Sequence, residues 1–170
     1  MRRPAPVIFA TMLLLWALVA LLNHYLAVWH VHVFAGGLLV TYGALHLPLR
    51  SGLLVTAALS LVLEAGTGIT PGTHLFLLGA AHAVIFHVRD RVPRDQTGTR
   101  VIIALLANLG LFLVLSFLLI GRGPAPGTMW PRLILDLVCS QVLIALVAPW
   151  FFALQERALV LAGATPRRLL

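Results

Sequence analysis

Six apolar segments separated by short connections make up most of the chain. They restrict it to folds in which most faces of each helix carry apolar side chains. They are residues 7–26, 33–49, 52–65, 74–88, 101–120 and 132–154. A helix needs about 20 apolar residues to cross the hydrocarbon core of a bilayer. The first, fifth and sixth segments reach that length, whereas a helix of the shortest segment covers only about 21 Å at 1.5 Å per residue. We therefore predict an all-α polytopic membrane protein with six transmembrane helices.

The composition leaves no room for a separate soluble domain. Hydrophobic residues make up 61% and charged residues 10% of the chain, whereas soluble domains are about half apolar and a quarter charged. We predict a single integral membrane domain over residues 1–170. The basic start and first apolar run imitate a secretory signal, but no small-residue cleavage site follows Leu22, so we expect a retained first helix. One cysteine, Cys139, excludes a disulfide framework.

Arginine placement predicts how the chain is oriented. All twelve basic residues are arginines, and they cluster in the short connections. With the N-terminus in the cytoplasm, ten of them fall on the inner side, and only Arg122 and Arg132 fall on the outer side. Such a bias is the positive-inside pattern of membrane proteins. It predicts a multi-pass protein of a bacterial plasma membrane with both termini cytoplasmic. It also explains the net charge of +7 without a nucleic-acid-binding face.

Two connections invite more specific expectations. Residues 66–72 are uncharged and rich in Gly, Pro and Thr, which suits a loop that dips into the membrane between short helices. The basic connection at residues 89–100 is expected to bind anionic membrane lipid.

The segment between these connections carries small side chains at helical spacing, Gly79, Ala80 and Ala83. Small residues let the backbones of neighbouring membrane helices approach closely. We therefore expect this fourth helix to be among the most buried.

Two acids, Glu64 and Asp136, lie inside or at the rim of apolar segments. Acids within the membrane are costly and call for a partner. Counting residues from Arg50 and from Pro131 places both at a similar depth below the outer face. Arg132 stands four residues before Asp136, on the same helix face. We predict a polar cluster of Glu64, Arg132 and Asp136; it could be a structural ion pair, a site of proton or solute handling, or a docking point.

Signals for chemistry are weak. Of the seven histidines, only His82 lies near the middle of a segment, so the two axial ligands of a membrane haem are not evident. No GxSxG, HExxH or Walker motif occurs. We predict a protein that is not an enzyme and has no cofactor, metal site or catalytic residues.

Two stretches, Leu-Pro-Leu-Arg-Ser-Gly at residues 47–52 and Leu-Glu-Ala-Gly-Thr-Gly-Ile-Thr-Pro-Gly at residues 63–72, resemble the central region of the rod shape-determining protein MreD family. The basic connection that follows is similar, as are an amide within the last segment and Pro-Trp-Phe-Phe before a basic tail. The resemblance covers nearly the whole chain. The family acid is often Asp and the amide often Asn, where this chain has Glu64 and Gln141. The remaining family-motif positions are Gly68, Gly72 and Pro149.

The resemblance implies a non-enzymatic scaffold of the bacterial elongation complex, which organises peptidoglycan synthesis and cell shape. Its direct partner would be MreC, and through it MreB, RodA and the transpeptidase that works with RodA. The family is similar in architecture to the substrate-binding subunits of energy-coupling-factor transporters. The alternative is therefore a substrate-binding membrane subunit of a vitamin or ion transporter, which would need a cavity with convergent polar groups.

Overall fold

The structure is a computed structural model that describes residues 4–65, 71–93, 96–120 and 126–164. Within these residues all regular structure is helical, as predicted. The α-helices are α1 (Pro4–Leu26), α2 (Gly36–His46), α3 (Leu49–Ala65), α4 (Thr73–Val88), α5 (Thr97–Ile120) and α6 (Pro126–Leu161). Two short 3₁₀ turns, η1 (Ala27–Trp29) and η2 (Arg89–Arg91), follow α1 and α4.

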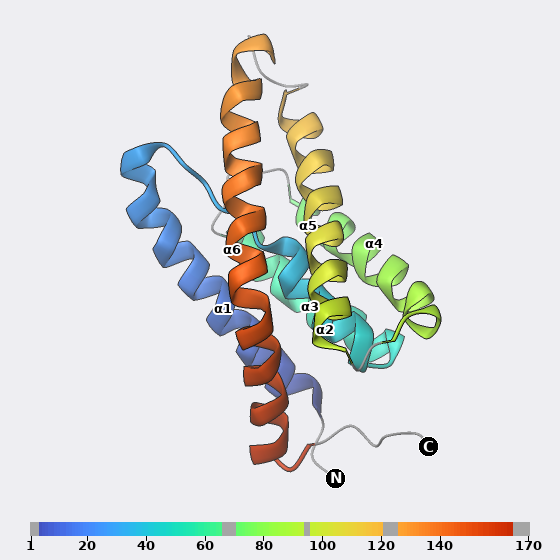
Figure 1. Ribbon diagram of the computed structural model, residues 1–170. Coiled ribbons are helices and arrows are strands. Elements are labelled where there is room, and N and C mark those ends of the chain that lie inside the picture. Colours follow the sequence, from blue (N-terminus) through green and yellow to red (C-terminus); the bar gives the residue numbers. More distant parts are fainter. Residues whose placement is uncertain (1–3, 66–70, 94–95, 121–125, 165–170) are drawn as a thin grey trace.

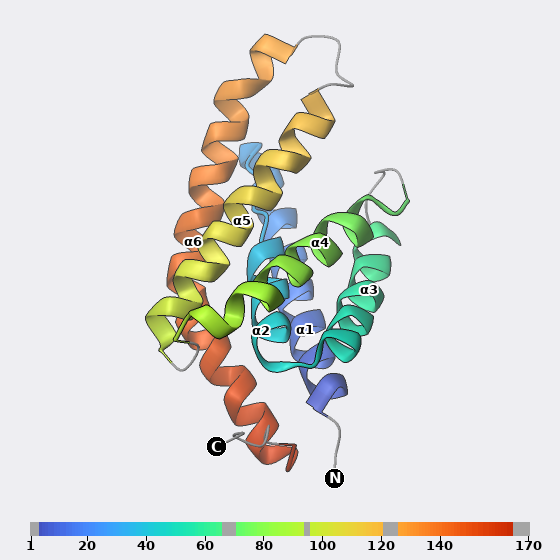
Figure 2. The same cartoon turned by 90° about the vertical axis from the view of Figure 1, so that its right-hand side faces the viewer.

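Successive helices run in alternating directions, so that α1 begins and α6 ends at the same end of the molecule (Figure 1). The α5–α6 pair extends beyond the other helices at the opposite end (Figures 1 and 2). Helix α4 is inclined to this pair and crosses in front of α2 in Figure 2. The short helices thus form a layer against the long ones.

The shortest α-helix is the centre of the fold. Helix α2 contacts each of the other five α-helices and packs most extensively on α5. Every residue of it from Gly36 to Leu45 is buried. Its side chains belong to both apolar clusters of the core, one shared with α1, α3, α5 and α6 and the other with α4 and α5. A helix that is apolar all round is stable only in such surroundings.

Among the described residues three helices, α1, α5 and α6, are long and apolar enough to cross a membrane, which agrees with the division into long and short segments. The predicted bounds of the fourth segment agree with α4 to within one residue. The second segment was expected to be helical over 33–49, but its helix covers only Gly36–His46. It ends there because Leu47 precedes Pro48 and adopts an extended backbone (ψ 152°), as residues before proline do.

The last helix is longer than predicted. Helix α6 has 36 residues, extends beyond the predicted segment 132–154 at both ends, and runs through Pro131 and Pro149. A proline removes one helical hydrogen bond, but neighbouring helices let membrane helices tolerate this loss. At 1.5 Å per residue α6 is about 54 Å long, well beyond the thickness of a hydrocarbon core of about 30 Å.

A glycine of α2 lies in close contact with the backbone of α5. A Cβ added to Gly37 would lie 2.3 Å from the backbone N of Asn108 and 2.5 Å from the carbonyl O of Ala104, both on α5. The expectation that α4 packs closely through Gly79 is wrong for contacts within this chain. A Cβ added to Gly79 meets nothing within 4 Å, Ala80 is exposed and Ala83 is half-buried. Small side chains occur at helical spacing in both α2 and α4. The two helices differ in whether a neighbouring helix packs against these side chains.

We predict that Gly37→Ala destabilises the protein by about 1–3 kcal/mol, because α2 and α5 must separate to admit the methyl group. Gly79→Ala is the matched control and should leave stability unchanged or slightly higher, since alanine favours helix. Thermal unfolding of both variants in detergent measures the difference. Equal stability of the two variants would contradict this account of α2.

Candidate functional site

Residues 31–35, between η1 and α2, are the non-helical segment whose backbone enters the interior. Val33 and Ala35 are buried, and the segment leads directly into the buried helix α2. Backbone N–H and C=O groups away from water need hydrogen-bond partners, and here no helical ladder provides them. The N–H of Val31 binds the backbone carbonyl O of Leu26 at 3.3 Å. The next three N–H groups bind side chains of α1 and α6, and a side chain of α5 binds the start of α2.

Helices α1 and α5 each contribute an asparagine. The amide of Asn23 forms two bonds with Val33: its Nδ2 donates to the carbonyl O and its Oδ1 accepts from the N–H, both at 2.8 Å. On α5, Oδ1 of Asn108 accepts the N–H of Gly37 at 3.1 Å. Asn108 is fully buried. The two amides thus anchor the segment at its middle and just beyond its end.

Helix α6 contributes two side chains that lie one helical turn apart. Oδ1 of Asp136 accepts the N–H of His32 at 2.8 Å, and Oγ of Ser140 accepts the N–H of Phe34 at 2.9 Å. The Ser140 hydroxyl donates in turn to the carbonyl O of Asp136 at 2.6 Å. Residues four apart share a helix face, so α6 presents both acceptors to alternate residues of the segment. Both acceptors are buried.

Glu64 has a different partner from Asp136. Its Oε1 accepts the N–H groups of His74 at 2.9 Å and of Leu75 at 3.2 Å, in the first turn of α4. A carboxylate is favourable at that end because the first N–H groups of a helix lack internal partners and carry partial positive charge. The helix begins after Gly72, whose φ of 90° is a conformation that favours glycine. Glu64 therefore ties the end of α3 to the start of α4.

The predicted cluster of Glu64, Arg132 and Asp136 does not form as an ion pair. Arg132 is exposed, and among the described residues no ion pair joins it to either acid. Both carboxylates bind backbone N–H groups instead. The acids were correctly singled out as needing a partner, but the partner is the backbone.

Three of the four family-motif positions lie within the described residues. Gly72 begins α4, and Pro149 lies inside α6. Nε2 of Gln141 donates to the carbonyl O of Leu105 at 3.2 Å and so joins α6 to α5. Gly68 lies outside the described residues.

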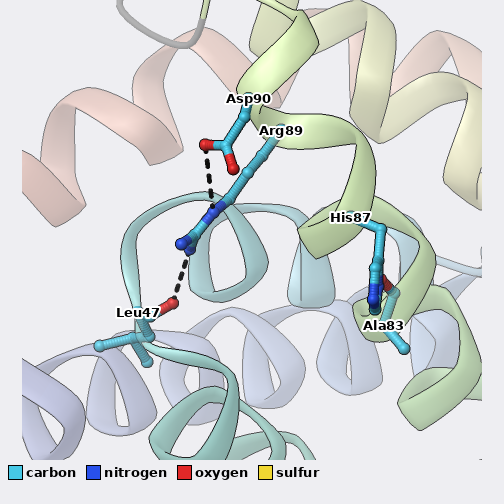
Figure 3. A network of polar contacts seen from close by, with 5 residues as sticks. All are labelled: Leu47, Ala83, His87, Arg89 and Asp90. Atoms are coloured by element: carbon cyan, nitrogen blue, oxygen red, sulfur yellow. Dashed lines mark hydrogen bonds and ion pairs between the residues drawn. The ribbon is translucent and has the colours of Figure 1, made fainter.

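Two arginines near the other end of α4 and the start of α5 bind protein groups. Nη1 of Arg89 donates to the carbonyl O of Leu47 at 3.0 Å, and its Nε lies 3.7 Å from Asp90 (Figure 3). Arg89 thereby caps the end of α2. Buried Arg100 forms an ion pair with Glu156 of α6. Of the other two arginines expected to bind lipid, Arg91 is exposed and Arg94 lies outside the described residues.

His82, the histidine in the middle of a segment, joins two helices. It is fully buried, and its Nδ1 lies 3.0 Å from the hydroxyl of Thr56 on α3. A Cβ added to Gly52 would lie 2.4 Å from its Nε2, so the ring fits against a glycine. This packing is the role that the structure gives it.

A cavity of about 270 Å³ borders the non-helical segment. Its wall comes from α1, residues 32–35, the start of α2, the end of α3 and the start of α4. The polar side chains in the wall are Asn23, His32 and His74, and the larger apolar ones include Trp16, Phe34, Leu39 and Leu78.

Asn23, Asn108 and Ser140, which hold the segment, were not among the residues predicted from the sequence. The available signal was their polarity within long apolar runs, the same signal that drew attention to Glu64 and Asp136. Comparison of the chain with protein-family models, with curated proteins and with solved structures finds no match.

We predict that Asp136→Ala lowers the free energy of unfolding by about 1–3 kcal/mol, because the N–H of His32 loses its acceptor. Asp136→Asn keeps an acceptor oxygen at this position and should cost less. Arg132→Gln should have no effect, since Arg132 pairs with neither acid. Thermal unfolding in detergent measures all three variants. Equal losses for Asp136→Asn and Arg132→Gln would favour the ion pair after all.

Proposed function

We propose that this chain is a non-enzymatic scaffold in a bacterial plasma membrane that binds a single-span partner through helix packing. The observation that carries the proposal is the use made of the two acids that lie within apolar segments. Glu64 and Asp136 accept hydrogen bonds from backbone N–H groups, which gives each a structural role. Side chains that organise the chain's own backbone suit a protein whose task is to present a fixed surface.

The resemblance to the MreD family supplies the biological setting. It supports MreC as the partner, with MreB, RodA and its partner transpeptidase reached through MreC. In that setting the chain helps to confine peptidoglycan synthesis to the cylinder of the cell and so contributes to cell shape.

Six crossings with both termini in the cytoplasm belong to the same proposal. The alternation of helix directions supports it, as does the ten-to-two bias of the arginines. Helix α2 is only about 17 Å long at 1.5 Å per residue. The five residues before it have a reach of at most about 17 Å, so the two together match a core of about 30 Å.

The small-residue face of α4 suits the partner helix. Ala80 is exposed, Gly79 and Ala83 are half-buried, and no described residue lies within 4 Å of a Cβ added to Gly79. These three residues share one face with Phe76, whose side chain is 75% exposed. In lipid, helices associate through close packing of small residues, so this face offers what a partner helix needs.

The alternative, a substrate-binding subunit of a transporter, is supported by the cavity beside residues 32–35. Its polar wall residues are not those of the predicted acid cluster. Purified protein that captures a vitamin or metal ion stoichiometrically, and does not bind an MreC-like helix, would favour this alternative.

The topology is tested by reporter fusions. We expect fusions at residues 97 and 170 to report the cytoplasm and a fusion at residue 126 to report the outside, because the arginine-rich connections stay inside. An outside signal at residue 97 would contradict six crossings.

Partner binding is tested by substitution on α4. We expect Gly79→Leu and Ala83→Leu each to reduce co-purification with an MreC-like single-span protein at least tenfold, about 1.4 kcal/mol, since they block close approach. Ala17→Leu on the exposed face of α1 is the matched control and should leave binding unchanged. All three variants should unfold at the temperature of the natural protein. Unchanged co-purification of both α4 variants would exclude this face.

A further inference from the structure

A second hollow, of about 150 Å³, is an apolar groove between α1 and α6. All nine residues of its wall are Leu, Ile, Val or Ala. Helix α1 contributes Leu15, Leu18 and Leu22 from one face, and α6 contributes Leu143 and Val147, one turn apart. Leu15 is buried whereas Leu18 is 55% exposed, so the groove opens from the core toward the surroundings of the bundle.

The size and surroundings of this groove restrict what can occupy it. Both α1 and α6 are long and apolar enough to cross a membrane, so in a bilayer the opening faces hydrocarbon. A helix with its side chains is about 10–12 Å wide and does not fit a groove of this volume. An engineered apolar cavity of about 150 Å³ in another protein binds benzene, a body of about six carbon atoms. The groove therefore suits a stretch of one hydrocarbon chain.

A positive charge lies above the groove on α6. Arg132 is exposed, and among the described residues it forms no ion pair. Leu143 follows it by 11 residues, close to three turns of about 3.6 residues, so both side chains lie on one face of the helix. At 1.5 Å per residue they are about 17 Å apart along the axis, close to the half-thickness of about 15 Å of a hydrocarbon core. Arg132 is thus at the depth of the headgroup of a lipid whose chain reaches Leu143.

The space between Arg132 and the groove is open toward α1. Figure 1 shows the end of α1 with η1 standing apart from α6, with residues 31–35 running back between them. Trp130, two residues before Arg132, packs edge-to-face on Phe117 of α5 with ring centroids 5.8 Å apart. Tryptophan is enriched at the depth of lipid headgroups, so Trp130 supports the same level for Arg132.

We propose that one phospholipid molecule binds here, with an acyl chain in the groove between α1 and α6 and its phosphate on the guanidinium of Arg132. The apolar wall selects the chain, and the charge selects the phosphate. The proposed topology makes this a lipid of the outer leaflet. The site does not involve α4, so its failure would leave the partner-binding proposal standing.

The test uses the full chain in detergent, freed of lipid, with three probes: palmitoyl-oleoyl phosphatidylglycerol, a diacylglycerol with the same chains, and dihexanoyl phosphatidylglycerol. The second lacks the phosphate, and the third has chains too short to reach from Arg132 to Leu143. Native mass spectrometry counts the bound molecules. We expect one long-chain phosphatidylglycerol to bind about tenfold tighter than the diacylglycerol, the effect of roughly one charge-assisted hydrogen bond, and the short-chain lipid to bind weakest.

Variants on α6 locate the two ends of the lipid. Arg132→Gln should lower the affinity for long-chain phosphatidylglycerol about tenfold, to that of the diacylglycerol, and Arg132→Lys should keep most of it. Val147→Phe fills the groove and should weaken both long-chain lipids at least tenfold. Val142→Phe is the matched control, because Val142 is 54% exposed and lies outside the groove, and it should bind as the natural chain does.

Thermal unfolding in lipid-free detergent checks the fold of each variant. If Val147→Phe does not fold, Leu18→Phe at the exposed rim of the groove takes its place. Arg132→Gln tests the phosphate contact in either case.

Three results would overturn the proposal. They are unchanged affinity of Arg132→Gln for phosphatidylglycerol, equal effects of Val147→Phe and Val142→Phe, and binding of several phosphatidylglycerol molecules with equal affinity, as in an ordinary layer of surrounding lipid. A dimer that forms only without phosphatidylglycerol, and that Val147→Phe abolishes, would assign the groove to a second copy of the chain instead.

Discussion

The requirement that backbone N–H groups be paired away from water governs this structure. Helices pair most of their N–H groups with their own carbonyl groups. Residues 31–35 cannot do so, because the chain enters the interior there without forming a helix. Asn23, Asn108, Asp136 and Ser140 supply the missing acceptors from three helices. Because each of these bonds fixes one helix relative to the start of α2, they set the arrangement of the bundle together with the apolar core.

Much of the fold could be predicted from the sequence, because apolar length and helical spacing are local properties. The long helices α1, α5 and α6 and the bounds of α4 followed from them. The extent of α2 did not, since Val33 and Ala35 are as apolar outside a helix as within one. Hydropathy reports that a residue is buried but not which backbone conformation it adopts. The full length of α6 did not follow either, because Pro131, a local helix breaker at the predicted start, is tolerated within this long packed helix.

The candidate site was predicted in part. The cost of a carboxylate within an apolar segment marked Glu64 and Asp136 as needing partners, whereas the partners themselves could not be deduced. Depth estimated from helix rise places residues along the membrane normal and says nothing of their lateral separation. The true partners, the N–H groups of His74 and His32, are present in every residue and have no sequence signature. Gly37 and Gly79 illustrate the same limit. Only Gly37 is packed against a neighbouring helix, and the sequence does not distinguish it from Gly79.

The spacing of the anchors along the chain also sets an order for biogenesis. His32 and Phe34 bind side chains that lie 104 and 106 residues later, on α6. At a synthesis rate of about 5–20 residues per second, the ribosome reaches those residues roughly 5–20 s after it has made the segment. Throughout that interval the N–H groups of His32 and Phe34 lack these acceptors. The contacts that hold the segment against α6 therefore form only after the last helix has been made.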